Sequence, residues 1–128
     1  MRVLLDTHVI IWWTMEPHKL SKPVIDALQS PASDIFVSPV SAWEIAYKHS
    51  QGKLEFPAAV IADFDQWIAK LRWSELPLTT KHAVVSARLD GAHKDPFDRM
   101  LAGQAKLAGL HLVSADPAFK RLGVETMW

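Results

Sequence analysis

Four acidic residues of this chain stand beside short apolar stretches, where strands are predicted to end or helices to begin: Asp6, Glu44, Asp98 and Asp116. Asp6 and Asp116 each follow an apolar run that is typical of a buried strand. Hard divalent cations prefer oxygen ligands, and carboxylates that converge at the ends of parallel strands can supply several of them. The four acids therefore predict a site for a divalent metal ion.

Each acid also has a structural alternative, as a helix cap that contributes about 1 kcal/mol. Glu44 stands three residues after Ser41, and Asp98 stands three residues after Asp95, which is the spacing of a capping box. Asp116, directly before a proline, can also begin a helix. For any one acid taken alone, capping is the more common role.

Asp6 and Asp98 fit the capping role least well. Asp6 directly follows a predicted strand, and Thr7 could cap the next helix instead. Asp95 can already cap the helix that contains Asp98, which leaves the Asp98 side chain free. If all four carboxylates packed together without a cation, they would repel each other and bind protons. A bound Mg²⁺ or Mn²⁺ removes this penalty.

Composition limits the class of protein. A chain of 128 residues, 49% of them hydrophobic, predicts one domain over residues 1–128 with a substantial core. The absence of cysteine excludes a disulfide framework, a zinc–thiolate site and a cysteine nucleophile. A net charge of +0 argues against nucleic-acid binding by bulk charge alone, but is compatible with an acidic site that has a local basic rim. With an acid as early as Asp6 and no long apolar run, we expect a soluble cytoplasmic protein without a membrane partner.

Strands and helices are predicted to alternate along the chain. Apolar runs indicate strands at 2–5, 34–38 and 111–114, with a short edge strand at 124–127 and an extended piece at 76–78. Helical patterns begin near residues 8, 22, 39, 57, 80 and 96, and the one over 57–73 reads as a single long amphipathic helix. Such alternation favours an α/β fold with a parallel sheet between helices, in which ligands bind at the carboxyl ends of the strands.

The order and spacing of the four acidic motifs resemble those of the PIN-domain ribonucleases, and more closely the VapC-like toxins of bacterial toxin–antitoxin pairs. The motifs are LLDTH at 4–8, SPVSAWEI at 38–45, DPFDRMLAGQA at 95–105 and LVSADPAF at 112–119. Ser114 and Ala115 replace the threonine usual before the last acid, a small departure because serine keeps the hydroxyl. The resemblance implies a PIN-like three-layer α/β/α sandwich with a short, mainly parallel central sheet.

The resemblance also implies an activity. It is the metal-dependent hydrolysis of RNA phosphodiester bonds by an endoribonuclease that uses Mg²⁺ or Mn²⁺, with transfer, ribosomal and messenger RNA all open as substrates. The implied metal-binding and catalytic residues are the four acids: Asp6, Glu44, Asp98 and Asp116. Thr7 and Ser114 would hydrogen-bond to these ligands, and Asp95 would be either a cap or a further member of this outer group. The implied partners are RNA, a cognate antitoxin and a second copy of the chain in a homodimer.

Basic residues near the acids could contact RNA phosphates, which would reconcile zero net charge with a polyanionic substrate. They are Lys48, Arg99, Lys120 and Arg121. The alternative for each of them is a solvated, salt-bridged surface position.

The chain has six tryptophans, which is many for its length. Trp43 and Trp67 lie on apolar helical stripes and are predicted to be in the core. Trp12 and Trp13 are adjacent on one predicted helix and cannot both point inward. One of them is therefore predicted to line a groove or a subunit interface. The resemblance implies two uses for such a surface, the homodimer contact and the groove that accepts an antitoxin, and stacking of an RNA base is a third.

Two other functions remain as alternatives. A haloacid-dehalogenase-like phosphatase would need an aspartate two residues after the first acid, where this chain has His8. We expect His8 to lie at the start of the next helix and not to bind the metal, because oxygen ligands suffice for a hard cation. The second alternative is a non-catalytic RNA- or protein-binding module of the same fold, whose acids only cap helices. Replacing Asp6 or Asp98 by asparagine separates a metal site from a set of caps.

Overall fold

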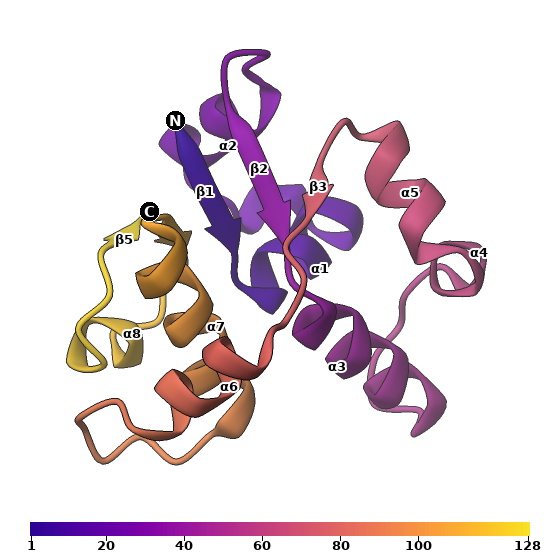
Figure 1. Ribbon diagram of the computed structural model, residues 1–128. Helices are drawn as coiled ribbons and strands as arrows, with labels where there is room; N and C mark the ends of the chain where they lie inside the picture. Colours follow the sequence, from indigo (N-terminus) through magenta and orange to yellow (C-terminus); the bar gives the residue numbers. More distant parts are fainter.

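A parallel sheet of five strands, in the order β3-β2-β1-β4-β5, runs through the middle of the protein. The computed structural model describes residues 1–128. The strands are β1 (Arg2–Leu5), β2 (Asp34–Val37), β3 (Ser74–Glu75), β4 (His111–Val113) and β5 (Thr126–Met127). Figure 1 shows β1 and β2 side by side, with their arrowheads toward α1 and α3. The predicted α/β class is confirmed, and all strand pairs are parallel.

The helices connect these strands, and several of them begin at a residue whose side chain caps the first turn. They are α1 (Thr7–Met15), α2 (Lys22–Gln29), α3 (Pro39–Ser50), α4 (Ala58–Ala62), α5 (Phe64–Lys70), α6 (Thr80–Ala87), α7 (Pro96–Ala108) and α8 (Ala118–Arg121), with a 3₁₀ turn η1 (Pro17–Lys19). Ser21 caps α2 and Thr79 caps α6, each accepting a hydrogen bond from a backbone N–H of the first turn. Gly109 ends α7 in the left-handed region, at φ 66°. None of the helices has the length and apolar character needed to cross a membrane.

The single helix predicted over 57–73 is wrong. The chain forms α4 and α5 instead, and they meet at Asp63, whose φ of −146° and ψ of 68° are not helical. The Asp63 carboxylate accepts a hydrogen bond from the backbone N–H of Gln66 and so caps α5. An aspartate side chain competes in this way with helix continuation, although the apolar spacing persists through the break. The extended segment is also earlier than predicted, because β3 occupies Ser74–Glu75 rather than 76–78.

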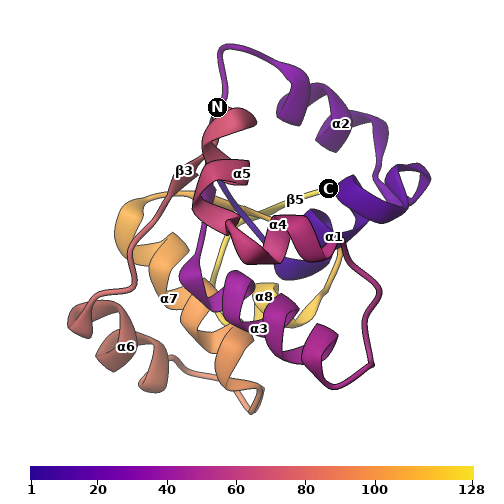
Figure 2. The ribbon, with the colours of Figure 1, turned by 90° about the vertical axis from the view of Figure 1, so that its right-hand side faces the viewer.

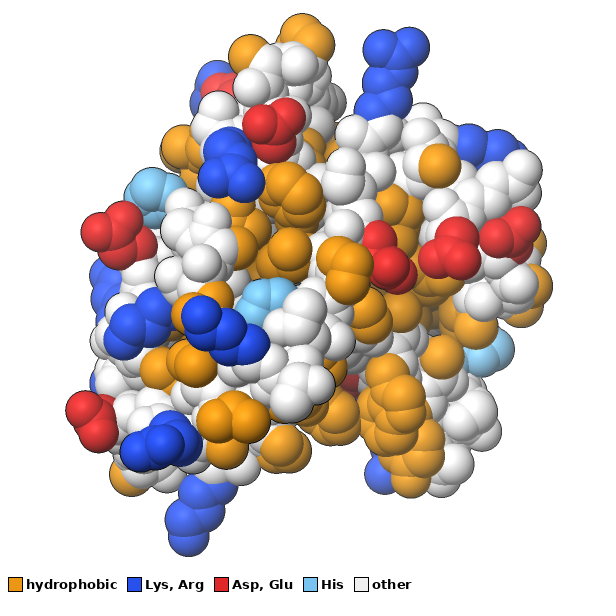
Figure 3. Space-filling model, in the orientation of Figure 1, with side chains coloured by type: hydrophobic (Ala, Val, Ile, Leu, Met, Phe, Trp, Pro, Cys, Tyr) orange, Lys and Arg blue, Asp and Glu red, His pale blue; other side chains and the backbone are white.

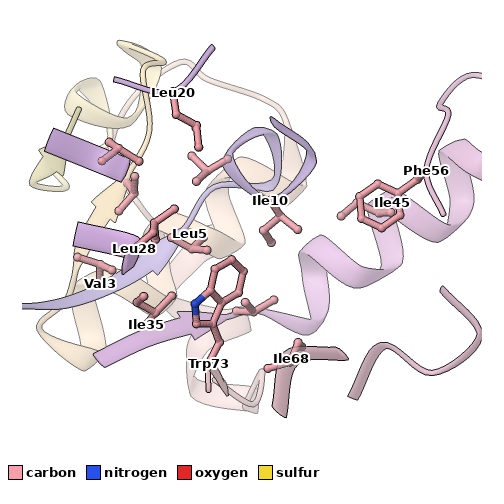
Figure 4. Close-up of a cluster of buried hydrophobic side chains, with 14 residues drawn as sticks. Val3, Leu5, Ile10, Leu20, Leu28, Ile35, Ile45, Phe56, Ile68 and Trp73 are labelled. Atoms are coloured by element: carbon pink, nitrogen blue, oxygen red, sulfur yellow. The ribbon is translucent and has the colours of Figure 1, made fainter. Parts of the chain in front are cut away.

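One face of the sheet is covered by α1, α2 and α5. Side chains alternate along a strand, so Val3 and Leu5 point to this face. Both side chains are fully buried. Figure 4 shows the Trp73 indole among Leu5, Ile35 and Ile68, which close this side of the core.

The opposite face is covered by α7 and α8, which makes the fold a three-layer α/β/α sandwich, as predicted. Leu4 packs here with Leu101 and Phe119, all with no exposed surface. Figure 2 shows α6 lying beside α7, away from α2. Their close approach depends on Gly103, because a Cβ atom placed there would lie 2.8 Å from the Cβ of Ser86.

Candidate functional site

Two of the four acids share a cavity at the carboxyl ends of neighbouring strands. β1 and β4 pair in parallel with Leu5 opposite Val113, so the segments that follow them leave the sheet at the same edge. Asp6 directly follows β1, and Asp116 lies three residues beyond β4. Both line a cavity of about 280 Å³. The sheet register thus brings together two carboxylates from opposite ends of the chain.

Asp6 is a buried acid with a raised pKa. Its side chain is only 5% exposed, and the Ser114 hydroxyl donates a 2.7 Å hydrogen bond to its Oδ2 atom. Burial raises the pKa of Asp6 from its usual 3.8 to about 6, against the lowering effects of Ser114 and His8, and the charge of Asp98 raises it further. A nearby cation would therefore favour the ionised form of Asp6.

Asp98 lies in the first turn of α7 and is partly buried. Burial raises its pKa, with smaller contributions in the same direction from the charges of Asp95 and Asp116, while a hydrogen bond from His93 lowers it. The His93 Nε2 and Asp98 Oδ2 atoms are 2.7 Å apart. Asp95 caps α7 by accepting hydrogen bonds from the N–H groups of Phe97 and Asp98, at 2.8 and 3.3 Å. Of the two roles left open for Asp95, the structure contains the cap, and the Asp98 side chain is free of capping.

His93 is a neighbour of the site that the sequence did not single out. It lies in the loop before α7, five residues before its partner Asp98. Neither helical nor strand periodicity marks this position, and only the folded loop brings the imidazole to the carboxylate.

Glu44 belongs to α3 and is paired with Lys48, whose Nζ donates to it at 2.7 Å. The predicted capping box of Ser41 and Glu44 is wrong, because Ser38 caps α3. Ser41 forms a buried 2.8 Å hydrogen bond with Thr7 instead. Thr7 therefore fastens α3 to α1, and its predicted alternative as the cap of α1 is also wrong. Glu44 lies one turn beyond Ser41, on the same side of α3.

The chemistry of the four acids fits a hard cation. Besides burial, the charge of Asp98 raises the pKa of Asp6, and the charge of Asp116 raises the pKa of Asp98. All are oxygen donors, as Mg²⁺ and Mn²⁺ prefer. No three Asp, Glu or His side chains lie close enough to share one ion as they stand. Asp98 and Glu44 each use one carboxylate oxygen, Oδ2 and Oε2, in the contacts with His93 and Lys48.

The predicted basic rim is only partly in place. Arg99 points inward, where its guanidinium donates hydrogen bonds to the carbonyl groups of Ser86, Leu89 and His93. Arg99 thus has a structural role, because its guanidinium N–H groups bind carbonyls at the end of α6 and in the loop before α7, and its contact with RNA phosphate stays a prediction. Lys120 and Arg121, at the end of α8, are exposed. Basic and acidic side chains both lie on the face shown in Figure 3.

Trp43 is not in the core, contrary to prediction. It is 53% exposed and stacks on Tyr47 and Phe97, with ring centroids 4.8 and 5.1 Å away. The inward face of α3 instead presents Val40 and Ile45, which are buried. Position 43 falls outside that face because an α-helix turns 100° per residue. By contrast, the prediction for Trp67 is confirmed, since it packs partly buried against the core.

Adjacent tryptophans of α1 point in different directions, as expected. Trp13 packs on Trp73, with ring centroids 5.9 Å apart. Trp12 lines the cavity that contains Asp6 and Asp116, together with Trp128. The prediction that one of the two lines a groove is confirmed.

Known proteins share both the sequence pattern and the fold. Residues 3–125 match the sequence profile of the PIN domain. Ribonuclease VapC22 of Mycobacterium tuberculosis is 30% identical over 115 residues, which cover 89% of this chain and 86% of that protein.

Two solved structures have the same fold. VapBC2 from Rickettsia felis, bound to a DNA fragment from its promoter, aligns with a TM-score of 0.73 and 18% identity over 100% of this chain and 98% of the other. FitAcB from Neisseria gonorrhoeae aligns with a TM-score of 0.65 and 20% identity over 98% and 96%. At such identities these structures support the fold alone.

Proposed function

Because this chain belongs to the PIN-domain family, we propose that it is a metal-dependent endoribonuclease and the toxin of a toxin–antitoxin pair. The observation that supports the activity best is the environment of Asp6. This buried carboxyl shares a cavity with Asp116 and is influenced by the charge of Asp98. Such an arrangement is unfavourable without a cation and suits one with oxygen ligands.

The proposed ligands of Mg²⁺ or Mn²⁺ are Asp6, Asp98 and Asp116, and Glu44 completes the set from α3. Bound there, the ion would supply positive charge at the scissile phosphate and make hydrolysis by water feasible near neutral pH. Carboxylate oxygens that are not bound to the ion can accept the proton that the attacking water loses.

Other side chains support these four acids. The Ser114 hydroxyl orients Asp6 and favours its ionised form. Lys120 and Arg121 are exposed a few residues after Asp116, and we propose that they attract the RNA backbone toward the acids. Lys48 can do the same only after it releases Glu44.

The proposed partners are RNA, an antitoxin and a second copy of the chain, and the proposed location is the cytoplasm, where such RNA is found. Support for the antitoxin comes from the similarity to the VapBC2 and FitAcB structures, which are toxin–antitoxin complexes. The homodimer is an expectation from the resemblance, and light scattering of the purified chain tests it.

The phosphatase alternative loses its support, because the family is that of PIN domains and His8 stands where a second aspartate is needed. The non-catalytic module remains the competing function. It would leave Asp98 paired with His93 and Glu44 paired with Lys48, as they stand in the structure.

Cleavage of a labelled mixture of RNAs tests the proposal. The purified chain is incubated with Mg²⁺, with Mn²⁺ and with EDTA, beside Asp98→Asn and the control Asp26→Asn. Asp26 is an exposed acid of α2 that pairs only with Lys22. We expect cleavage that needs metal, disappears in Asp98→Asn and persists in Asp26→Asn. Equal cleavage by wild type and Asp98→Asn would refute the site, and absence of both cleavage and calorimetric Mn²⁺ binding in wild type would refute the activity.

A further inference from the structure

The cavity at the acidic site has a second wall made of aromatic rings. Asp6 and Asp116 line the cavity of about 280 Å³ together with His8, Trp12 and Trp128. The aromatic residues come from α1 and from the segment after β5, so the fold gathers them from distant parts of the chain. The proposed metal ligands do not need these rings, and none of the three rings is fully buried, although Trp12 also packs against the edge of the core.

These rings form a partly open group. The centroids of Trp12 and Trp128 are 5.8 Å apart with planes at 70°, and those of His8 and Trp12 are 5.7 Å apart at 49°. Trp128 is 39% exposed. Outside the cavity lining, the Lys19 Nζ atom, which is paired with Glu16, lies 5.7 Å from the centre of the Trp12 ring. Trp12 thus lines the cavity, whereas Trp13, which is also partly buried, packs on Trp73 and does not line it.

The acidic wall and the aromatic wall together limit which class of ligand the cavity can bind. An anionic group alone would be repelled by the carboxylates and would gain nothing from the indoles. An aliphatic group would use the indoles, but it has no donors for the carboxylate oxygens. A nucleobase satisfies both walls, because its flat face stacks on aromatic rings and its N–H groups can donate to carboxylate oxygens that are not bound to the metal ion.

We propose that this cavity binds one unpaired nucleobase of the RNA, next to the phosphodiester at the acids, and that Trp12 and Trp128 contact its face. The proposal rests on the proposed function, since it assigns the acids to RNA cleavage. It adds a base-binding site to that function. A base within a duplex is stacked and paired and cannot enter the cavity, so the preferred substrate is single-stranded or looped RNA.

Binding without cleavage tests the proposal. A fluorescein-labelled single-stranded RNA hexamer is titrated with the protein in EDTA at low ionic strength, and anisotropy gives Kd. The variants are Trp12→Leu, Trp12→Phe and Trp128→Leu, with Trp43→Leu as the matched control. Trp43 is 53% exposed but does not line the cavity. Thermal unfolding of each variant shows whether it is folded.

We expect Trp12→Leu and Trp128→Leu to weaken binding about tenfold, the effect of losing one base–aromatic stack. Trp12→Phe should recover part of the affinity, and Trp43→Leu should leave it unchanged. In cleavage assays with Mg²⁺ the same two leucine variants should raise KM more than they lower kcat, because the indoles do not touch the reacting phosphate. If Trp12→Leu is unfolded, Trp128→Leu and Trp12→Phe still decide the outcome.

Two results would overturn the proposal. One is wild-type affinity and wild-type KM in all of the Trp12 and Trp128 variants, which would indicate that the cavity serves a protein segment such as the antitoxin. The other is an equal loss of affinity in Trp43→Leu, which would mean that exposed aromatic residues in general contact RNA. In both cases metal-dependent cleavage by the wild type would keep the proposed function intact. Base binding with no metal-dependent cleavage would instead refute the function alone.

Discussion

The hydroxyl of Ser114 donates a 2.7 Å hydrogen bond to the carboxylate of Asp6, although 108 positions separate the two residues in the sequence. The same hydroxyl accepts a 3.0 Å hydrogen bond from the backbone N–H of Asp116. One side chain thus links the acids that follow β1 and β4. Both acids that this hydroxyl contacts are proposed metal ligands. Removing the hydroxyl should therefore act mainly on metal binding.

Ser114→Ala should lower the affinity for Mn²⁺ about tenfold, because residues that orient metal ligands contribute on that scale. Ser114→Thr keeps the hydroxyl and should stay within about threefold of wild type. Isothermal titration calorimetry of the three proteins measures the difference. Equal Mn²⁺ affinity in the alanine and threonine variants would show that the hydroxyl does not act on the site.

Asp6→Asn should stabilise the metal-free protein at neutral pH. The pKa of Asp6 is about 6 in the folded protein and 3.8 in its usual state, so the folded state binds the proton more tightly. The contribution of Asp6 to the free energy of unfolding should therefore be largest below about pH 4, fall as the pH rises toward 6, and stay low above it. The variant lacks this fall, and its advantage at pH 7 is on the order of 3 kcal/mol by the linkage relation.

Urea unfolding in EDTA at pH 4 and pH 7 checks this prediction, with Asp26→Asn as the control for a change at an exposed acid. The informative quantity is the difference between variant and wild type at each pH. A difference that does not grow with pH would contradict the raised pKa of Asp6. Added Mg²⁺ should stabilise wild type more than Asp6→Asn.

Arg99→Lys should destabilise the protein by about 1–3 kcal/mol, because a lysine cannot serve several carbonyl groups at once and leaves some of them unpaired. These carbonyls belong to the end of α6 and the loop before α7, including that of His93. Chemical denaturation measures the loss, and Arg88→Lys at an exposed position serves as the control. Full stability together with weaker RNA binding in Arg99→Lys would contradict the structural role of Arg99 and support its contact with RNA.

Lys120→Ala and Arg121→Ala should each weaken RNA binding and reduce its salt dependence. Each lost phosphate contact lowers the slope of log K against log salt by about 0.7 for a single strand. Titrations of the RNA hexamer at several salt concentrations provide the slopes. Lys22→Ala, on the exposed surface of α2, should leave both affinity and slope unchanged. Unchanged slopes in the two α8 variants would show that this helix does not contact RNA phosphates.

Gly103→Ala should destabilise the protein by about 1–3 kcal/mol, as overpacking typically does. The new Cβ would lie 2.8 Å from the Cβ of Ser86 and 3.1 Å from its Cα and backbone N, so helix α6 must move. We expect this loss of stability even though alanine is a better helix former than glycine by about 1 kcal/mol. Thermal unfolding tests this, and adding Ser86→Gly should recover part of the loss. A Gly103→Ala protein as stable as wild type would contradict the tight packing of α6 on α7.

Local chemistry made much of the fold predictable. Helix starts at Ser21, Thr79 and Asp95 follow from side chains that cap the first turn. The apolar runs that become β1, β2 and β4 lie between such signals, and parallel pairing follows from the alternation of strands and helices. The break at Asp63 was missed, because the apolar periodicity continues through it and outweighed the preference of aspartate for caps.

The site was predictable to the extent that strand ends determine it. Asp6 and Asp116 meet because parallel strands leave the sheet at the same edge. The partner of Asp98, His93, depends on loop conformation, which periodicity does not encode, whereas the pair of Glu44 and Lys48 follows from their spacing of four residues on one helix. For the same reason as at Asp98, nothing in the sequence distinguishes the guanidinium of Arg99, which binds backbone carbonyls, from a surface charge.

Both outer strands of the sheet, β3 and β5, consist of only two residues each. An unpaired strand of that length offers few backbone groups to an incoming chain, and such short edges protect native sheets from edge-to-edge aggregation. The sheet of this protein is thus poorly suited to extension by another polypeptide. Whatever assembles with it, whether a second copy or an antitoxin, should dock on helices and on loops instead of continuing the hydrogen-bond ladder.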